Sequence, residues 1–113
     1  MKVITTRAGM FLTGTEIADA VMHYGAVLAR TGSVDRVDIP VLYGTRVRRA
    51  SFLVGWLTDT ASISATTGRE ELTDPGAVVD LYEKAARGGR MRAVPFTREE
   101  IAQAMEAVEN LTE

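Results

Sequence analysis

The chain has 113 residues, of which 46% are apolar and 25% charged, and its net charge is −2. This length predicts one domain, residues 1–113, and the composition is that of a folded globular protein. General binders of nucleic acids or of membrane surfaces are usually basic, which this chain is not. The absence of cysteine excludes thiolate metal ligands and cysteine nucleophiles. We therefore expect a cytoplasmic protein with no membrane contact, metal or cofactor.

Residues 13–30 carry the pattern of an amphipathic helix. Thr13-Gly14-Thr15-Glu16 is typical of a capping box, in which Thr13 caps the helix and Glu16 reaches back to it. Apolar side chains follow at spacings of three and four residues, which places them on one face. They are Ile17, Val21, Tyr24 and Leu28.

A β-hairpin is predicted next, with strands over residues 37–43 and 46–57 around a turn at Gly44-Thr45. Pro40 has no amide hydrogen to donate, so we expect the first of these strands at a sheet edge. A shorter strand over residues 60–66 would complete a three-stranded meander.

The C-terminal part of the chain predicts two further helices. One begins at Asp74-Pro75 and ends at Gly88-Gly89, and an extended stretch over residues 91–96 follows it. The other occupies residues 97–111 and opens with Thr97-Arg98-Glu99-Glu100, a second capping box. The predicted fold is therefore α+β, a small antiparallel three-stranded sheet with three helices packed mainly on one face.

His23 is the only histidine, and Asp19 and Glu16 precede it on the first predicted helix. Asp19 lies one turn before His23, where a carboxylate could orient the imidazole as a general base. The alternative is that Asp19 and His23 form an exposed pair with no catalytic role. Glu16 and Asp19 would then lie near the helix N-terminus only because the helix dipole favours negative charge there. No nucleophile is placed beside His23. These three residues are therefore candidates only, and the sequence assigns no catalytic residue.

Two arginine clusters are candidates for binding nucleic acid or another anion. Arg46, Arg48 and Arg49 begin the return strand of the hairpin. Arg87, Arg90 and Arg92 surround Gly88-Gly89. A two-stranded ribbon can enter a nucleic-acid groove, and a guanidinium can hold a phosphate or a carboxylate. The alternative reading is solvated charge that protects strand edges.

Trp56 is the only tryptophan, and strict alternation places it on the same strand face as Ala50, Phe52 and Val54. That position predicts a core residue. At the end of a sheet it would instead anchor a partner, because tryptophan is enriched at interaction hot spots. The last predicted helix offers a second surface of this kind, with Met105, Val108 and Leu111 on its apolar stripe.

Residues 12–20 and 28–32, followed by Val37-Asp38-Ile39-Pro40, resemble small uncharacterised proteins of GC-rich, actinobacterial-type bacteria. The resemblance covers less than half of the chain. It implies no known activity and transfers no functional residue, but it favours the order of helix and then hairpin.

The leading functional hypothesis is a protein that acts through association, most simply as a homodimer. The first alternative is a nucleic-acid-binding module that uses the arginine-rich hairpin. The second alternative is a small enzyme that uses His23.

Overall fold

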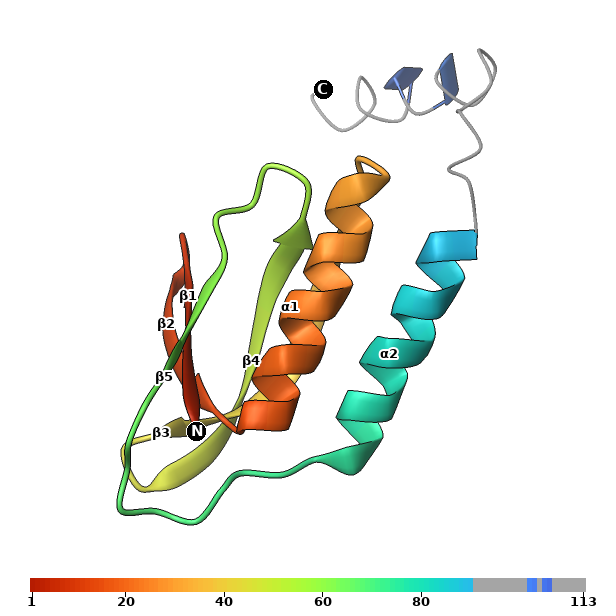
Figure 1. Ribbon diagram of the computed structural model, residues 1–113. Coiled ribbons are helices and arrows are strands. Elements are labelled where there is room, and N and C mark those ends of the chain that lie inside the picture. Colours follow the sequence, from red (N-terminus) through yellow and green to blue (C-terminus); the bar gives the residue numbers. More distant parts are fainter. Residues whose placement is uncertain (91–101, 104, 107–113) are drawn as a thin grey trace.

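The computed structural model describes residues 1–90, 102–103 and 105–106. Within the first 90 residues, one helix packs against a five-stranded antiparallel sheet with the order β4-β3-β2-β1-β5, and a second helix packs alongside the first (Figure 1). The elements in chain order are β1 (Lys2–Thr6), β2 (Gly9–Thr13), α1 (Thr15–Arg30), β3 (Val34–Tyr43), β4 (Arg46–Gly55), β5 (Ala61–Ser64) and α2 (Pro75–Arg90).

The α+β class with an antiparallel sheet is confirmed, but the prediction of three strands and three helices is wrong. Residues 2–13 form a hairpin, β1–β2, in which Ile4 lies opposite Phe11. β5 pairs with β1 and not with β4, so the sheet is not a meander. The extended stretch predicted over residues 91–96 lies outside the described residues, as does most of the helix predicted over residues 97–111.

β3 lies between β4 and β2, so the prediction that Pro40 marks an edge strand is wrong. The reason is that β2 covers only one end of β3. The pairing of these two strands is confined to Leu12 and Leu42, and β2 ends at Thr13. The buried hydroxyl of Thr13 donates a hydrogen bond to the Pro40 carbonyl at 2.8 Å. The missing proline amide therefore breaks no pairing with β2.

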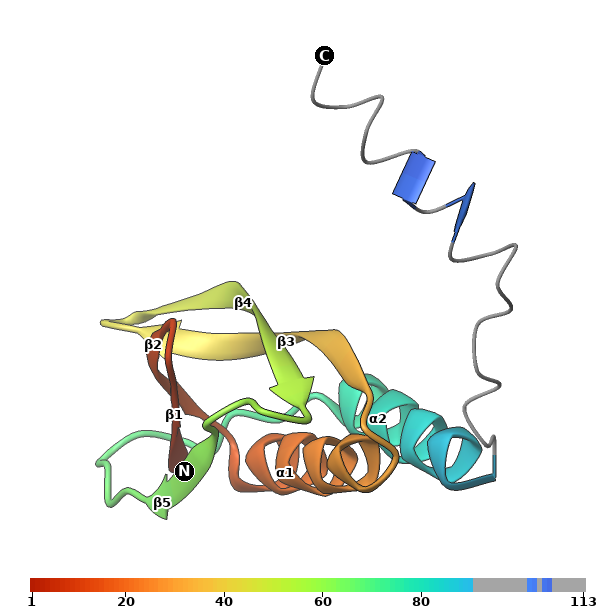
Figure 2. The same ribbon diagram turned by 90° about the horizontal axis from the view of Figure 1, so that it is seen from above.

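The sheet is strongly curled around α1. β4 and β5 are its two edges, yet only residues 56–60 connect them. Figure 2 shows the β3–β4 hairpin above α1 and β5 beside one end of α1, with β1 and β2 between β5 and the hairpin. The curl brings the C-terminal end of β4 close to the β1–β2 turn.

The apolar face predicted for α1 is confirmed, since Ile17, Val21, Tyr24 and Leu28 are all buried. They pack against inward-facing residues of β1, β3, β4 and α2, namely Ile4, Val37, Ile39, Val41, Phe52, Val54, Leu81 and Ala85. The hydroxyl of Tyr24 donates to a carboxylate oxygen of Asp35 at 2.5 Å, which joins α1 to β3. Burial, together with this bond, raises the pKa of Tyr24 to about 12. The phenol is therefore neutral at physiological pH.

α2 begins as predicted, because the Asp74 carboxylate accepts a hydrogen bond from the Ala77 amide at 3.1 Å. It does not end at Gly88-Gly89 but continues to Arg90. Gly88 packs against α1, and a Cβ at this position would lie 3.5 Å from Val27. Gly88 therefore lies inside the helix, where it faces α1, and does not stop the helix.

The capping box predicted for α1 is replaced by a contact from a distant segment. Gly14 is the N-cap residue and has no side chain, and the Thr13 hydroxyl donates its hydrogen bond to the Pro40 carbonyl. Instead, the Glu71 carboxylate accepts a hydrogen bond from the Thr15 amide. The same carboxylate pairs with the Met1 ammonium group at 2.8 Å. These contacts, with the ammonium contributing most, lower the pKa of Glu71 to about 2.

We predict that Glu71→Gln lowers stability at neutral pH and removes part of its acid dependence. A folded-state pKa of about 2, below the ordinary value of 4.5, means that this carboxylate stabilises the fold above pH 4.5. That contribution is lost progressively as the pH falls from 4.5 to 2. Thermal unfolding followed between pH 7 and pH 2 should show a smaller fall in Tm for the variant. Glu70→Gln is the matched control, and an equal effect of both substitutions would contradict the assignment.

Candidate functional site

The most unusual local structure lies where the chain leaves β4. Gly55 has φ +122° and Leu57 has φ +59°. The Trp56 amide donates to the Ser33 carbonyl at 2.9 Å, and Thr58 donates to the Gly55 carbonyl through its amide and, at 2.8 Å, its hydroxyl. Leu57 is the only non-glycine residue with positive φ in the described part of the chain, and such strain is commonest at functional sites.

This turn corrects the prediction that Trp56 belongs to the core. Ala50, Phe52 and Val54 are buried as expected, but Trp56 is 52% exposed. The positive φ of Gly55 breaks the two-residue alternation on which the prediction depended. Trp56 instead lies at the end of the sheet, directly after β4, as the alternative interpretation expects.

Trp56 belongs to an exposed apolar patch, which we call the end patch. Its other members are Val34, Leu53 and Leu57, and between 47% and 76% of each member is exposed. Val34 pairs with Gly55, and Leu53 lies two residues before Gly55 on the same outer face of the sheet. Single exposed apolar residues are ordinary, but several at one end of a sheet are typical of surfaces that take part in interactions.

The end patch adjoins a free strand edge. Among the described residues, β4 pairs only with β3, so one side of this ten-residue strand carries unpaired backbone groups. The other edge strand, β5, has four residues. A long exposed edge with apolar neighbours is a template for pairing with another strand.

The opposite end of β4 carries the predicted arginine cluster. Arg46, Arg48 and Arg49 are all exposed. The guanidinium of Arg48 lies 5.6 Å from the centre of the Tyr43 ring, a cation–π contact across the hairpin. Neither Arg46 nor Arg48 makes a salt bridge with any of the described residues.

Arg49 forms ion pairs within the fold. Its Nε lies 2.7 Å from an Asp38 carboxylate oxygen, and its Nη1 lies 3.6 Å from an Asp74 oxygen. Hydrogen bonds from Arg49 and from Ser51 lower the pKa of Asp38. Arg49 is therefore less available to an external anion than its two neighbours.

The candidate catalytic residues are not brought together. His23 is exposed on α1, and its ring packs against Tyr82 of α2 with centroids 5.1 Å apart. Asp19 pairs with Lys2 at 2.5 Å instead of orienting His23. Glu16 is exposed in the first turn of the same helix.

The other predicted residues divide between described and undescribed parts of the chain. Arg87 is exposed on α2, near enough to Tyr24 for its charge to oppose the rise in the Tyr24 pKa. Met105 is 65% exposed. Arg92, Val108 and Leu111 lie outside the described residues, and for Arg90 only the backbone, the last residue of α2, is described.

Residues 1–90, with 102–103 and 105–106, contain no group of three or more histidine or acidic side chains that could hold a metal ion. None of the helices in this part of the chain is long and apolar enough to cross a lipid bilayer. Comparisons with protein-family models, with curated proteins and with solved structures found no match to the chain. The bacterial resemblance therefore stays a prediction.

Proposed function

We propose that this protein acts through self-association, as a homodimer in which β4 of one copy pairs in an antiparallel manner with β4 of the other. The observation that carries the proposal is the end patch beside a free ten-residue edge strand. An edge of this kind gains backbone hydrogen bonds when a second strand joins it, and the apolar side chains beside it are removed from water.

The distribution of charge along β4 favours a second copy as the partner. One end of the strand carries Arg46 and Arg48 without acidic partners among the described residues, and the other end carries Trp56. An antiparallel arrangement about a two-fold axis places the arginine end of each strand against the tryptophan end of the other. A guanidinium over an indole ring is a favourable pair, and the arginines of the two copies stay apart.

Trp56→Arg should convert the dimer into a monomer. The substitution removes the aromatic member of the pair and places a third cation next to the partner's arginine end, where like charges repel. Light scattering during size-exclusion chromatography measures the mass directly. Because Trp56 is the only tryptophan, its fluorescence in the unsubstituted protein should also shift to longer wavelength on dilution.

Ile63→Arg is the matched control, since Ile63 is 63% exposed and lies on the other edge strand, β5. This variant should remain dimeric, with circular dichroism confirming that both variants are folded. A monomeric unsubstituted protein at all concentrations would reject the proposal. Loss of the dimer in the β5 variant alone would move the interface to that edge.

A nucleic-acid-binding module is the second candidate function, because Arg46 and Arg48 lie exposed next to Tyr43. An aromatic ring among cations is the arrangement on which bases stack. The same chromatogram addresses this function through the ratio of absorbance at the nucleic-acid and protein wavelengths. Nucleic acid that co-elutes at low salt and dissociates as salt rises would place this function first.

A further inference from the structure

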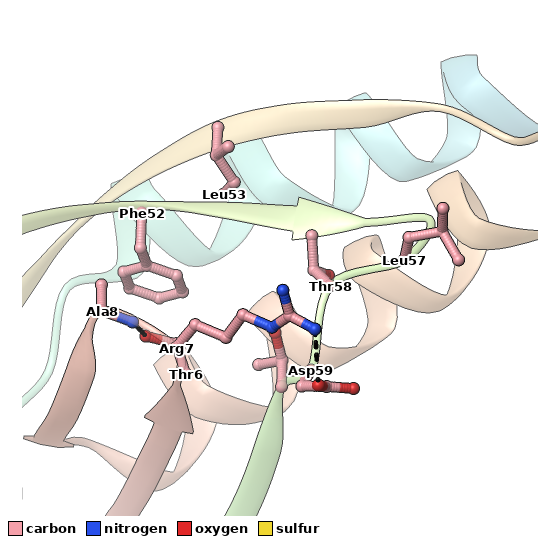
Figure 3. Close-up of a pocket in the computed structure, with 9 residues that line it drawn as sticks. Thr6, Arg7, Ala8, Phe52, Leu53, Leu57, Thr58 and Asp59 are labelled. Atoms are coloured by element: carbon pink, nitrogen blue, oxygen red, sulfur yellow. Dashed lines mark hydrogen bonds and ion pairs between the residues drawn. The ribbon is translucent and has the colours of Figure 1, made fainter.

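A pocket of about 390 Å³ lies between the two edges of the curled sheet. It is formed by the β1–β2 turn, the C-terminal end of β4 and the connection from β4 to β5. This volume falls within the range of small-molecule sites, roughly 300–1,000 Å³. Figure 3 shows the aromatic ring of Phe52 and the side chain of Arg7 pointing into the same space.

The pocket has an apolar wall and one cationic group at its mouth. Phe52 and Leu57 supply the apolar wall, and Leu53 borders the pocket from the outer face of β4 (Figure 3). Arg7 extends from the β1–β2 turn across the opening toward Asp59 (Figure 3). Arg7 is the only basic residue among the described residues that line the pocket. An apolar body with one fixed charged contact is the usual composition of a site for a small amphipathic ligand.

A ligand can replace Asp59, the residue with which Arg7 pairs within the chain. The Arg7 Nη2 and Asp59 Oδ2 atoms lie 3.4 Å apart, and both side chains are 81% exposed. A single long contact between exposed ions contributes little to stability. A guanidinium can instead hold an incoming carboxylate through two parallel hydrogen bonds, which is a stronger arrangement. The cost of displacing Asp59 is therefore small.

A second observation concerns Thr60, which also lines the pocket. Its hydroxyl oxygen is buried and has no hydrogen-bond partner among the described residues. Buried hydroxyl groups in folded proteins almost always have a partner, either in the protein or outside it. Next to it lies the strained Leu57, held by the turn at Gly55–Thr58. Both features lie in the same connection, between β4 and β5.

We propose that this pocket binds a small amphipathic monocarboxylic acid. The apolar chain of the ligand lies along Phe52 and Leu57, and its carboxylate replaces Asp59 on Arg7. A ligand with one negative charge fits better than a phosphate dianion, because Asp59 remains close to the cation and repels a second charge. The pocket borders the end patch, with which it shares Leu53 and Leu57, but Arg7 and Phe52, which define the site, do not belong to that patch.

The test uses octanoate as the probe, titrated into the full chain and followed by calorimetry and by amide chemical shifts. Arg7→Gln should weaken octanoate binding about tenfold or more, because it removes the charged hydrogen bonds. Asp59→Asn should tighten binding, because it removes the competing carboxylate. Arg30→Gln is the matched control, since Arg30 is an exposed arginine in the last turn of α1 and does not line the pocket.

Octanol provides the second comparison, since it has the same chain length without the charge. It should bind more weakly than octanoate, and its affinity should not change in Arg7→Gln. Chemical shifts should move at Phe52, Leu57 and Thr60 in the folded variants. Absence of octanoate binding, equal affinities for octanoate and octanol, or an Arg7→Gln affinity that matches Arg30→Gln would each overturn the proposal.

Discussion

Replacing Gly55 with alanine is expected to lower the free energy of unfolding by about 3 kcal/mol or more. Two costs add at this position. Gly55 has φ +122°, a conformation that residues with a Cβ rarely adopt. The new methyl group would also overlap the Ser33 carbonyl oxygen and lie 3.1 Å from the Leu28 Cβ. Neither neighbour can easily withdraw, because Ser33 O accepts the Trp56 amide and Leu28 is buried.

Urea unfolding of Gly55→Ala and two control variants separates these costs. Gly32→Ala carries the conformational cost alone, since φ is +67° and the added Cβ meets open space; we expect roughly 1–2 kcal/mol. Gly68→Ala meets open space without positive φ and should be close to neutral. If Gly55→Ala were no worse than Gly32→Ala, the close approach of the β4 end to residue 33 would be incorrect.

The parts of the fold that the sequence predicts well are those with a long and regular pattern. The apolar face of α1 and the hairpin around Gly44 both follow from local periodicity, and both are present. The hairpin of residues 2–13 is not predicted, because its strands have five residues each, too few for a clear alternation of apolar and polar residues. Its signal is the run Val3-Ile4-Thr5-Thr6, which is rich in β-branched residues and leads to a turn before Gly9.

Missing that hairpin changed the predicted topology. If β1 and β2 are left out, the strand at residues 61–64 can pair only with β4. The strand that contains Pro40 then has a neighbour, β4, on one side only and is predicted to be an edge strand. Pairing between strands distant in sequence depends on which edges the fold brings together, and local propensity does not encode it. The same reason explains why Glu71, rather than Thr13, caps α1.

The candidate site was predicted in part. Trp56 was recognised as a possible partner anchor, and the arginines of β4 as an exposed cluster. Leu53 and Leu57 were not identified, although Leu53 is an apolar residue on the outward-facing positions of its strand. The pocket could not be foreseen, because Arg7 and Asp59 are brought together only by the curl of the sheet.

Gly14→Ala is expected to destabilise the protein by about 3 kcal/mol through a different mechanism, the displacement of the segment before α2. Gly14 has φ −66° and ψ 151°, which any residue adopts, so the cost is steric only. The added Cβ would overlap the backbone carbonyl oxygen of Leu72. A backbone group cannot rotate away as a side chain can, so the whole segment around residue 72 must move.

That movement would break several contacts at once. Glu71 caps the Thr15 amide and pairs with the Met1 ammonium group, and the Leu72 amide lies 3.3 Å from the Met1 sulfur. Two residues later, Asp74 caps α2. We therefore expect amide hydrogen exchange in Gly14→Ala to accelerate most in the first turns of α1 and α2, while the β3–β4 hairpin stays protected.

Gly76→Ala is the matched control for this prediction. Its added Cβ would make only an ordinary contact, 3.6 Å from an Asp74 carboxylate oxygen, and alanine favours the helix by up to about 1 kcal/mol over glycine. This variant should be as stable as the unsubstituted protein or more so. Uniform acceleration of exchange in Gly14→Ala, across β3 and β4 as well as the two helices, would contradict a local displacement and show that α2 and the sheet unfold as one unit.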